Sequence, residues 1–80
     1  MSSIPEQINA ILVTDFELPA ESLTPDADLR DDLGLDSLDA VDLASKLEEQ
    51  KGIQIKTQAL IELNTLGDVY TLVKDLSKKG

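Results

Sequence analysis

The sequence predicts an all-α fold, a small four-helix bundle with three longer helices, one short third helix and a long first loop. Apolar residues recur every three or four positions in three separate stretches, and residues that favour helix ends stand at the borders of these stretches. The only alternating segment, residues 53–55, has no second strand to pair with, and a strand needs partners to be stable. Eighty residues suffice for one small core, so we expect a single domain over residues 1–80.

The first helix is predicted over residues 3–16. Ser3 and Glu6 have the spacing of a capping box, and Pro5 is tolerated beside them because first-turn amides have no partner within a helix. The apolar residues that recur at helical spacing are Ile4, Ile8, Ile11, Leu12 and Phe16.

A long loop is predicted from Glu17 to Leu35, where Pro19 and Pro25 interrupt the helical pattern. A structureless loop of this length is uncommon in a small domain. We therefore expect the loop to lie over the core and to contain a short turn at residues 24–27. The side chains expected to anchor it are those of Leu18, Leu23, Leu29 and Leu33.

The second helix is predicted over residues 37–51. Asp36 favours a helix start because its carboxylate can accept hydrogen bonds from first-turn amides, and Gly52 favours a helix end. We expect residues 53–55 to form an extended connector that buries two isoleucines.

Two further patterns complete the bundle. Thr57 is placed to cap a short third helix that runs through Leu63, and Thr65 and Asp68 have the spacing of another capping box. The final helix is expected to end near residues 78–79. Its apolar stripe consists of Val69, Leu72, Val73 and Leu76.

Charge is distributed unevenly along the chain. The formal net charge is −9, yet residues 15–49 carry twelve acids against two basic residues, whereas residues 50–80 carry three acids against five lysines. An acidic surface repels nucleic acid and anionic membranes and speeds association with basic proteins. We therefore expect partners with basic patches, and neither nucleic acid nor membrane. The simpler alternative is that the acids only keep a small protein soluble.

Cysteine and histidine are both absent. The chain therefore has no thiol nucleophile or thiolate zinc site, and it lacks the commonest general base. We therefore do not expect an ordinary hydrolase or a metal site, and any sulfur chemistry must come from outside the chain. The start of the chain shows no basic leader and no long apolar run, so we expect a cytoplasmic location, and we expect a monomer.

One face of the predicted second helix is apolar and must be buried. Leu38 lies on the opposite face, with Asp39 to one side. An exposed leucine alone is ordinary, but an apolar side chain ringed by acids is typical of an interface anchor. The apolar face comprises Ala40, Leu43, Ala44 and Leu47, and the outward face comprises Leu38, Asp42, Ser45 and Glu49.

Glu48 and Glu49 lie near the end of this helix, where its dipole disfavours each carboxylate by about 0.3–1 kcal/mol. The placement indicates a role other than helix stability, although a merely solvated surface gives the same pattern. Ser37 occupies the first position of the predicted second helix, at the end opposite Glu48 and Glu49. Unpaired amides and the helix dipole stabilise a phosphate at this position. The surrounding aspartates oppose a phosphate dianion but tolerate a covalent phosphodiester. Taken alone, Ser37 is better explained as an ordinary helix-start serine.

The motif Asp-Leu-Gly-Leu-Asp-Ser-Leu-Asp at residues 32–39 closely resembles the acyl carrier proteins of dissociated synthase systems. The resemblance covers the whole chain, because Asp42-Leu43, Leu-Glu-Glu at 47–49, Gly-Ile-Gln-Ile at 52–55 and Thr-Leu-Gly-Asp at 65–68 keep the same register. It implies a carrier and not an enzyme.

By this resemblance, Ser37 would accept 4′-phosphopantetheine from coenzyme A through a magnesium-dependent phosphopantetheinyl transferase, and the thiol of the arm would hold the acyl group. The partners implied are that transferase and acyl-transfer, synthase or ligase enzymes with basic patches. The residues implied in docking them are Asp36, Leu38, Asp39, Asp42, Glu48 and Glu49.

The family also implies an acyl pocket between the helices. A packed core predicts the same residues. Those expected to line the pocket are Val41, Leu47, Ile55, Leu60, Ile61 and Leu63.

Three departures from the family pattern limit the choice of pathway. Lys51 and Ser45 stand where bulkier apolar residues are frequent, and residues 56–63, usually acidic, are neutral overall. Fatty-acid, polyketide and specialised acyl pathways all remain open, and the neutral stretch favours a dedicated pathway over housekeeping fatty-acid synthesis.

Two alternative functions remain at this point. A D-alanyl or other amino-acyl carrier shares the Asp-Ser-Leu region, and an acidic interaction module without a prosthetic group shares the charge pattern. A calcium loop beginning at Asp26 is excluded, because Arg30, Asp31 and Ser37 occupy its fifth, sixth and twelfth positions.

Overall fold

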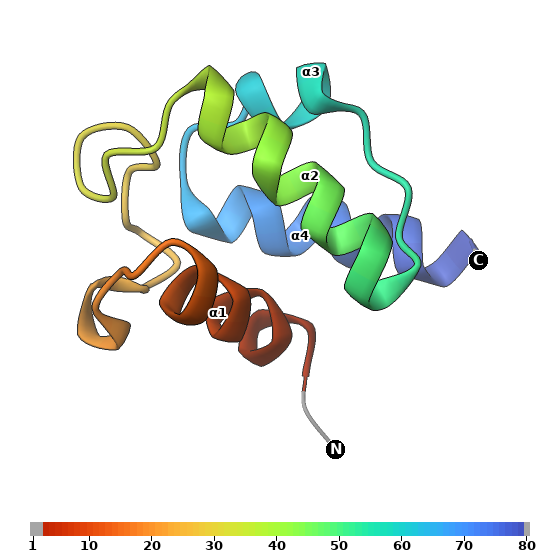
Figure 1. The fold of residues 1–80 in the computed structure, drawn as a ribbon, viewed down its shortest axis with the longest axis horizontal. Helices are drawn as coiled ribbons and strands as arrows, with labels where there is room; N and C mark the ends of the chain where they lie inside the picture. The colour runs from red at the N-terminus through yellow and green to blue at the C-terminus, as the bar shows by residue number, and fades with distance from the viewer. Residues whose placement is uncertain (1–2, 80) are drawn as a thin grey trace.

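The computed structural model describes residues 3–79 and confirms the all-α fold. Four α-helices and one 3₁₀ turn follow one another along the chain (Figure 1). No named strand occurs within residues 3–79, where a single isolated bridge pairs Asp28 with Thr65. The elements are α1 (Ile4–Asp15), η1 (Ala20–Ser22), α2 (Ser37–Lys51), α3 (Thr57–Ile61) and α4 (Leu66–Lys79).

Helix α1 begins as predicted. The Ser3 hydroxyl accepts a hydrogen bond from the Glu6 amide at 3.4 Å, Pro5 lies in the first turn, and the helix ends at a cap formed by Phe16. Its inner face is attached to α4 by a hydrogen bond of 2.5 Å from the Tyr70 hydroxyl to Oδ1 of Asn9. Burial raises the pKa of Tyr70.

The first loop lies over the core, as its leucines predict. Leu23, Leu29 and Leu33 are buried, and the expected turn closes with the Ala27 amide donating to the Thr24 carbonyl at 3.0 Å. The 3₁₀ turn η1 was not predicted. It follows Pro19, whose fixed backbone suits the residue preceding such a turn.

Three backbone hydrogen bonds connect this loop to the start of α4. The Leu29 amide donates to the Asn64 carbonyl at 2.9 Å, the Leu66 amide to that of Ala27 at 3.0 Å, and the Gly67 amide to that of Pro25 at 2.9 Å. A Cβ atom on Gly67 would stand 3.0 Å from the Pro25 oxygen, so a larger residue would require the loop to shift by a few tenths of an ångström. The loop is thus fixed along part of its length by segments far away in sequence.

Helix α2 has the predicted limits. Asp36 is its N-cap, and Gly52 ends it in the left-handed conformation with φ of 67°. The buried face matches the predicted apolar stripe, because Leu43, Ala44 and Leu47 are buried and Ala40 is half-buried. Residues 53–55 connect α2 to α3 without regular secondary structure, and their two isoleucines are partly buried against the core.

The third helix differs from its prediction. Lys56, not Thr57, is the N-cap of α3, and it makes no side-chain capping bond. The helix ends at Ile61, two residues before the predicted end, because the backbone turns at Glu62 and the Leu63 amide bonds back to the Leu60 carbonyl at 3.1 Å.

The predicted capping box of α4 is present. The Asp68 amide donates to the Thr65 hydroxyl at 3.3 Å, and the Thr65 amide donates to the Asp68 carboxylate at 3.2 Å. Val69 and Val73 are buried, and Leu72 is partly buried against the core. Leu76 is half-buried.

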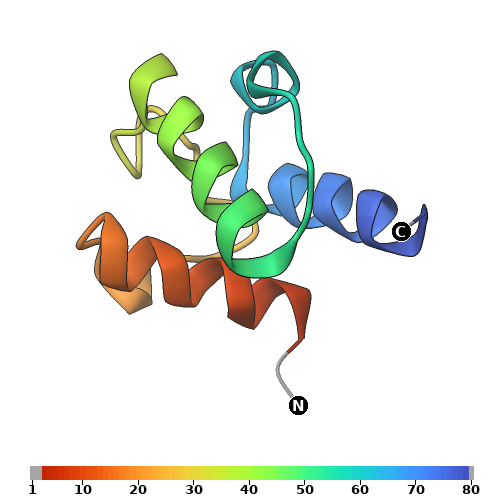
Figure 2. The same ribbon diagram turned by 45° about the vertical axis from the view of Figure 1, so that its right-hand side comes forward.

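The helices enclose one apolar core. Helix α1 packs against α4 and α2 packs against α3, so the short helix stands beside the first half of α2 (Figures 1 and 2). The most deeply buried side chains of the core come from α1, α2 and α4. No polar or charged residue is buried in the part of the chain that the structure describes. These side chains are Ile8, Leu12, Leu47, Leu66, Val69 and Val73.

Candidate functional site

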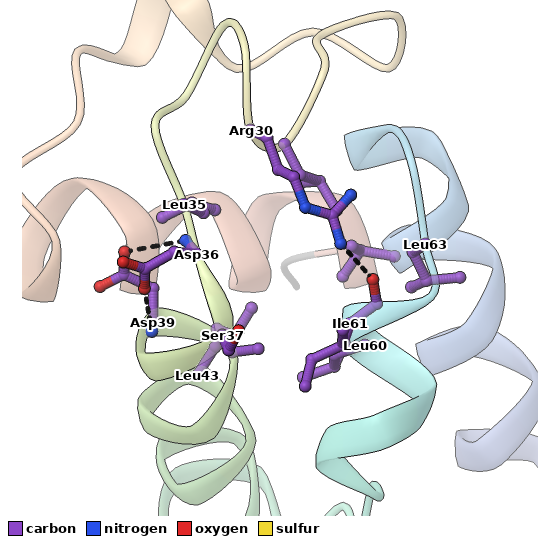
Figure 3. A pocket seen from close by; sticks show the side chains of 12 residues that line it. Arg30, Leu35, Asp36, Ser37, Asp39, Leu43, Leu60, Ile61 and Leu63 are labelled. Atoms are coloured by element: carbon purple, nitrogen blue, oxygen red, sulfur yellow. Dashed lines mark hydrogen bonds between the residues drawn. The ribbon is translucent and has the colours of Figure 1, made fainter.

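Ser37 is the first residue of α2, and its side chain is exposed. The residue before it caps the helix, since the Asp36 carboxylate accepts from the Asp39 amide at 3.1 Å and the Asp39 carboxylate accepts from the Asp36 amide at 3.2 Å (Figure 3). This reciprocal capping box fixes the direction in which the chain enters the helix. It therefore holds the Ser37 hydroxyl in a defined, accessible position.

The segment before the helix is equally fixed. The Leu35 amide donates to the Leu29 carbonyl at 2.8 Å, and Leu33 is buried. Gly34 adopts φ of 68°, a left-handed conformation that favours glycine and lets the loop reverse toward α2. The buried side chain of Leu33 and the turn at Gly34 thus hold the segment so that Ser37 lies at the surface.

A small cavity adjoins Ser37 between the start of α2 and the end of α3 (Figure 3). Its volume is about 30 Å³, room for about one water molecule, whereas ligand pockets commonly enclose about 300–1,000 Å³. Its wall is mostly apolar, with Arg30, Asp36, Ser37 and Asp39 on the polar side. The apolar lining residues are Leu29, Leu35, Ala40, Leu43, Leu60, Ile61, Leu63 and Val69.

Only half of the residues expected to line an acyl pocket lie at this cavity. Leu60, Ile61 and Leu63 line it, whereas Val41, Leu47 and Ile55 do not. Val41 is 48% exposed because it lies three residues from Leu38 and shares its outward face. Leu47 is completely buried farther along α2, and Ile55 packs against the core from the connector.

The sequence did not single out Arg30. Its guanidinium donates a hydrogen bond of 2.5 Å to the Ile61 carbonyl, and both residues line the cavity (Figure 3). Arg30 is the only arginine in the chain and stands within its most acidic stretch. The position of this basic residue among acids is the one feature of the sequence that could have indicated it.

The predicted outward face of α2 is solvent-exposed. Leu38 is 78% exposed, and Asp42, Glu48 and Glu49 are exposed along the same helix. Asp36 is exposed at the N-cap, and Asp39 is half-buried. The surface therefore carries two exposed apolar side chains, those of Leu38 and Val41, between carboxylates.

Two carboxylates outside this face have shifted pKa values. The amides of Asp31 and Arg30 donate to the Asp28 carboxylate and lower its pKa, and those of Thr65 and Asn64 lower the pKa of Asp68. Because the folded pKa lies below the unfolded value, each carboxylate stabilises the fold above the unfolded pKa. That contribution is lost as the pH falls through the folded pKa.

Within residues 3–79, no three carboxylate side chains are grouped so that they could hold a metal ion. Of the helices described, none has the length and apolar character needed to cross a bilayer.

Residues 6–73 match the family described as the phosphopantetheine attachment site. An acyl carrier protein from Saccharopolyspora erythraea is 44% identical over 71 residues, which cover 89% of this chain and 75% of that protein. Acyl carrier protein 2 of Ralstonia nicotianae is 41% identical over 75 residues, covering 94% of this chain and 93% of its own length.

Proposed function

Since the chain belongs to the phosphopantetheine-attachment family of acyl carrier proteins, we propose that Ser37 bears the 4′-phosphopantetheine arm and that the protein shuttles acyl groups between partner enzymes. The observation that carries this assignment is the position of Ser37. Its hydroxyl is exposed at the first turn of α2, on a backbone held by the Asp36–Asp39 capping box, at the mouth of an apolar cavity.

The residues around Ser37 suit a covalent phosphodiester. First-turn amides of a helix lack intrahelical partners and favour negative charge, which compensates for the neighbouring aspartates. In the proposed modification the Ser37 oxygen attacks the phosphorus of coenzyme A that carries pantetheine. An oxygen–phosphorus bond forms, the pyrophosphate bond breaks, adenosine 3′,5′-bisphosphate leaves, and the hydroxyl proton passes to the transferase. The arm then supplies a terminal thiol that holds the acyl group as a thioester.

The exposed face of α2 suits basic partners. Leu38 supplies an apolar anchor, and the acids around it attract basic patches and orient the encounter. We assign this face to docking the transferase and the enzymes that load, extend or unload the cargo. The carboxylates assigned to it are Asp36, Asp39, Asp42, Glu48 and Glu49.

The pathway we favour is a dedicated one. The surface of α3 carries little net charge, because exposed Lys56 opposes exposed Glu62 and Gln58 lies between them. Partners that recognise acids at this position would bind the chain weakly. We further propose that residues 1–80 act as one carrier domain, because all four helices contribute to one core. We also propose that this domain works in the cytoplasm and has no catalytic activity of its own.

Intact mass spectrometry tests the assignment of Ser37. The purified protein is incubated with coenzyme A, magnesium and a promiscuous phosphopantetheinyl transferase. We expect the wild type to gain the mass of one arm and the Ser37→Ala variant to gain none. Ser77→Ala is the matched control, because Ser77 is also exposed but lies on α4, and its replacement should leave the mass gain intact.

Failure of the wild type to gain mass, with a transferase that modifies a known carrier in the same assay, would favour the interaction module without a prosthetic group. A mass gain that persists in Ser37→Ala would place the arm elsewhere. The mass of the species bound to the protein isolated from its native host then separates acyl cargo from D-alanine or another amino acid.

A further inference from the structure

Arg30 connects the first loop to the end of α3. Ile61, whose carbonyl accepts its hydrogen bond, is the last residue of that helix. The final carbonyls of a helix have no partner within it, so the guanidinium provides one. Figure 3 shows the side chain crossing from the loop to α3 beside the cavity that Ser37 adjoins.

The backbone of Arg30 is itself held firmly. Its amide donates to the Asp28 carboxylate at 2.9 Å, and its carbonyl accepts from the Gly34 amide at 3.0 Å. The Asp28 amide in turn donates to the Asp32 carboxylate at 2.8 Å. The guanidinium therefore reaches α3 from a fixed turn, and a displacement of α3 would stretch the bond instead of carrying the loop with it.

Helix α3 has few constraints of its own. It comprises five residues, far fewer than an isolated helix needs to be stable, and its N-cap residue Lys56 makes no side-chain capping bond. Leu60 is its one fully buried side chain. Of the elements that line the cavity, α3 is thus the one most readily displaced.

The cavity is too small for an acyl chain while α3 stays in place, since its volume is about 30 Å³. Admitting a chain requires α3 to separate from α2. Building on the carrier function proposed above, we propose that Arg30 is a latch. Its hydrogen bond to Ile61 keeps the cavity closed in the unloaded protein and opposes the entry of long acyl chains, so it sets which chain lengths the carrier shields.

Hydrogen exchange in the unmodified protein tests the latch directly. The reporters are the amides of Glu62 and Leu63, which donate to the carbonyls of Gln58 and Leu60. Loss of a single exposed hydrogen bond should accelerate their exchange about fivefold in Arg30→Gln. Lys74→Gln, which removes the same charge from an exposed position on α4, should change nothing at α3.

Unchanged exchange at α3 in Arg30→Gln would overturn the proposal. Equal acceleration in all four helices would also overturn it, because Arg30 would then contribute to overall stability alone. Acceleration confined to α3 supports the latch.

Cargo shielding provides a second measurement on the loaded protein. Acetyl and decanoyl thioesters are cleaved with hydroxylamine on the wild type and on Arg30→Gln. We expect the variant to shield the decanoyl thioester several-fold better and to leave the acetyl thioester unchanged. Equal shielding in the two proteins contradicts the role in chain length. An absent arm would instead refute the carrier function, and the exchange measurement would still decide whether the latch exists.

Discussion

Two neighbouring residues, Ser37 and Leu38, lie exposed in the first turn of α2 and differ in their surroundings. Ser37 offers an exposed hydroxyl beside the cavity, whereas Leu38 points its apolar side chain into solvent. A side chain that is 78% exposed adds little to the stability of the monomer. The structure thus separates the proposed chemistry from the proposed docking within two consecutive positions.

The Leu38→Ala variant should therefore lose docking without losing stability. We expect the rate of arm transfer by a phosphopantetheinyl transferase to fall about tenfold, because truncating an interface anchor costs about 1–2 kcal/mol. The free energy of unfolding should change by less than about 0.5 kcal/mol. Urea denaturation and transferase kinetics measure the two quantities.

Val13→Ala is the matched control for this experiment. Val13 is 39% exposed on α1, away from the start of α2, and its truncation should leave the transfer rate unchanged. Equal effects of the two substitutions, or an unaffected rate in Leu38→Ala, would remove Leu38 from the docking surface.

Individual residues were predictable where local spacing determines them. The exposure of Leu38 follows from the apolar stripe opposite it, and the capping of α2 by Asp36 follows from the residue type. Val41, expected in a pocket, is 48% exposed and does not line the cavity, and its three-residue distance from Leu38 already indicated the outward face. The bond from Arg30 to Ile61 was not predictable, because the two residues meet only once the loop has folded onto the bundle.

At the level of elements, local capping residues determined the limits of the long helices. The conformation of the first loop depended instead on contacts with residues far away in the sequence. The limits of α2 and the capping box of α4 agree with the sequence. The early end of α3 and the 3₁₀ turn after Pro19 do not have such local signals. Short elements bury too little surface to be determined by their own residues, so the packing of their neighbours sets their ends.

The junction between the first loop and α4 provides a prediction at this level. Gly67→Ala should destabilise the fold by about 1 kcal/mol, because overpacking costs about 1–3 kcal/mol and the gain in helix propensity returns at most about 1 kcal/mol. The new Cβ would meet the Pro25 oxygen, which cannot retreat without weakening its own hydrogen bond to the Gly67 amide. Urea denaturation measures the change.

Ser45→Ala serves as the control, because Ser45 lies exposed within α2 and its replacement should change the free energy of unfolding by less than about 0.5 kcal/mol. A Gly67→Ala variant as stable as the wild type would show that the loop adjusts freely to α4.

For the molecule as a whole, acidic charge is the dominant electrostatic property. The net charge is −9, and the one ion pair found in the described residues joins Lys46 to Asp15 at 3.9 Å. A partly exposed surface pair of this kind, with an N–O distance near the limit for an ion pair, contributes about 0–1 kcal/mol and cannot offset the repulsion among the remaining acids. The charge that we propose attracts basic partners therefore also weakens the folded state.

Salt should accordingly stabilise the protein. Raising sodium chloride from about 10 mM to about 1 M shortens the Debye length from about 30 Å to about 3 Å and screens the acids from one another. We expect the urea midpoint to rise over this range, and to rise less in the double variant Asp31→Asn/Asp42→Asn, which carries fewer exposed acids. A midpoint that falls, or that stays constant in both proteins, would contradict net repulsion in the folded state.

The hydrogen bonds between the first loop and α4 also have a consequence for biosynthesis. They join residues roughly 40 positions apart, and the loop they fix leads directly into Ser37. A ribosome makes the amino-terminal part first, so the loop is synthesised before its partners at residues 64–67. The nascent chain therefore cannot form the hydrogen bonds that fix the loop before Ser37 until residues 64–67 have been made.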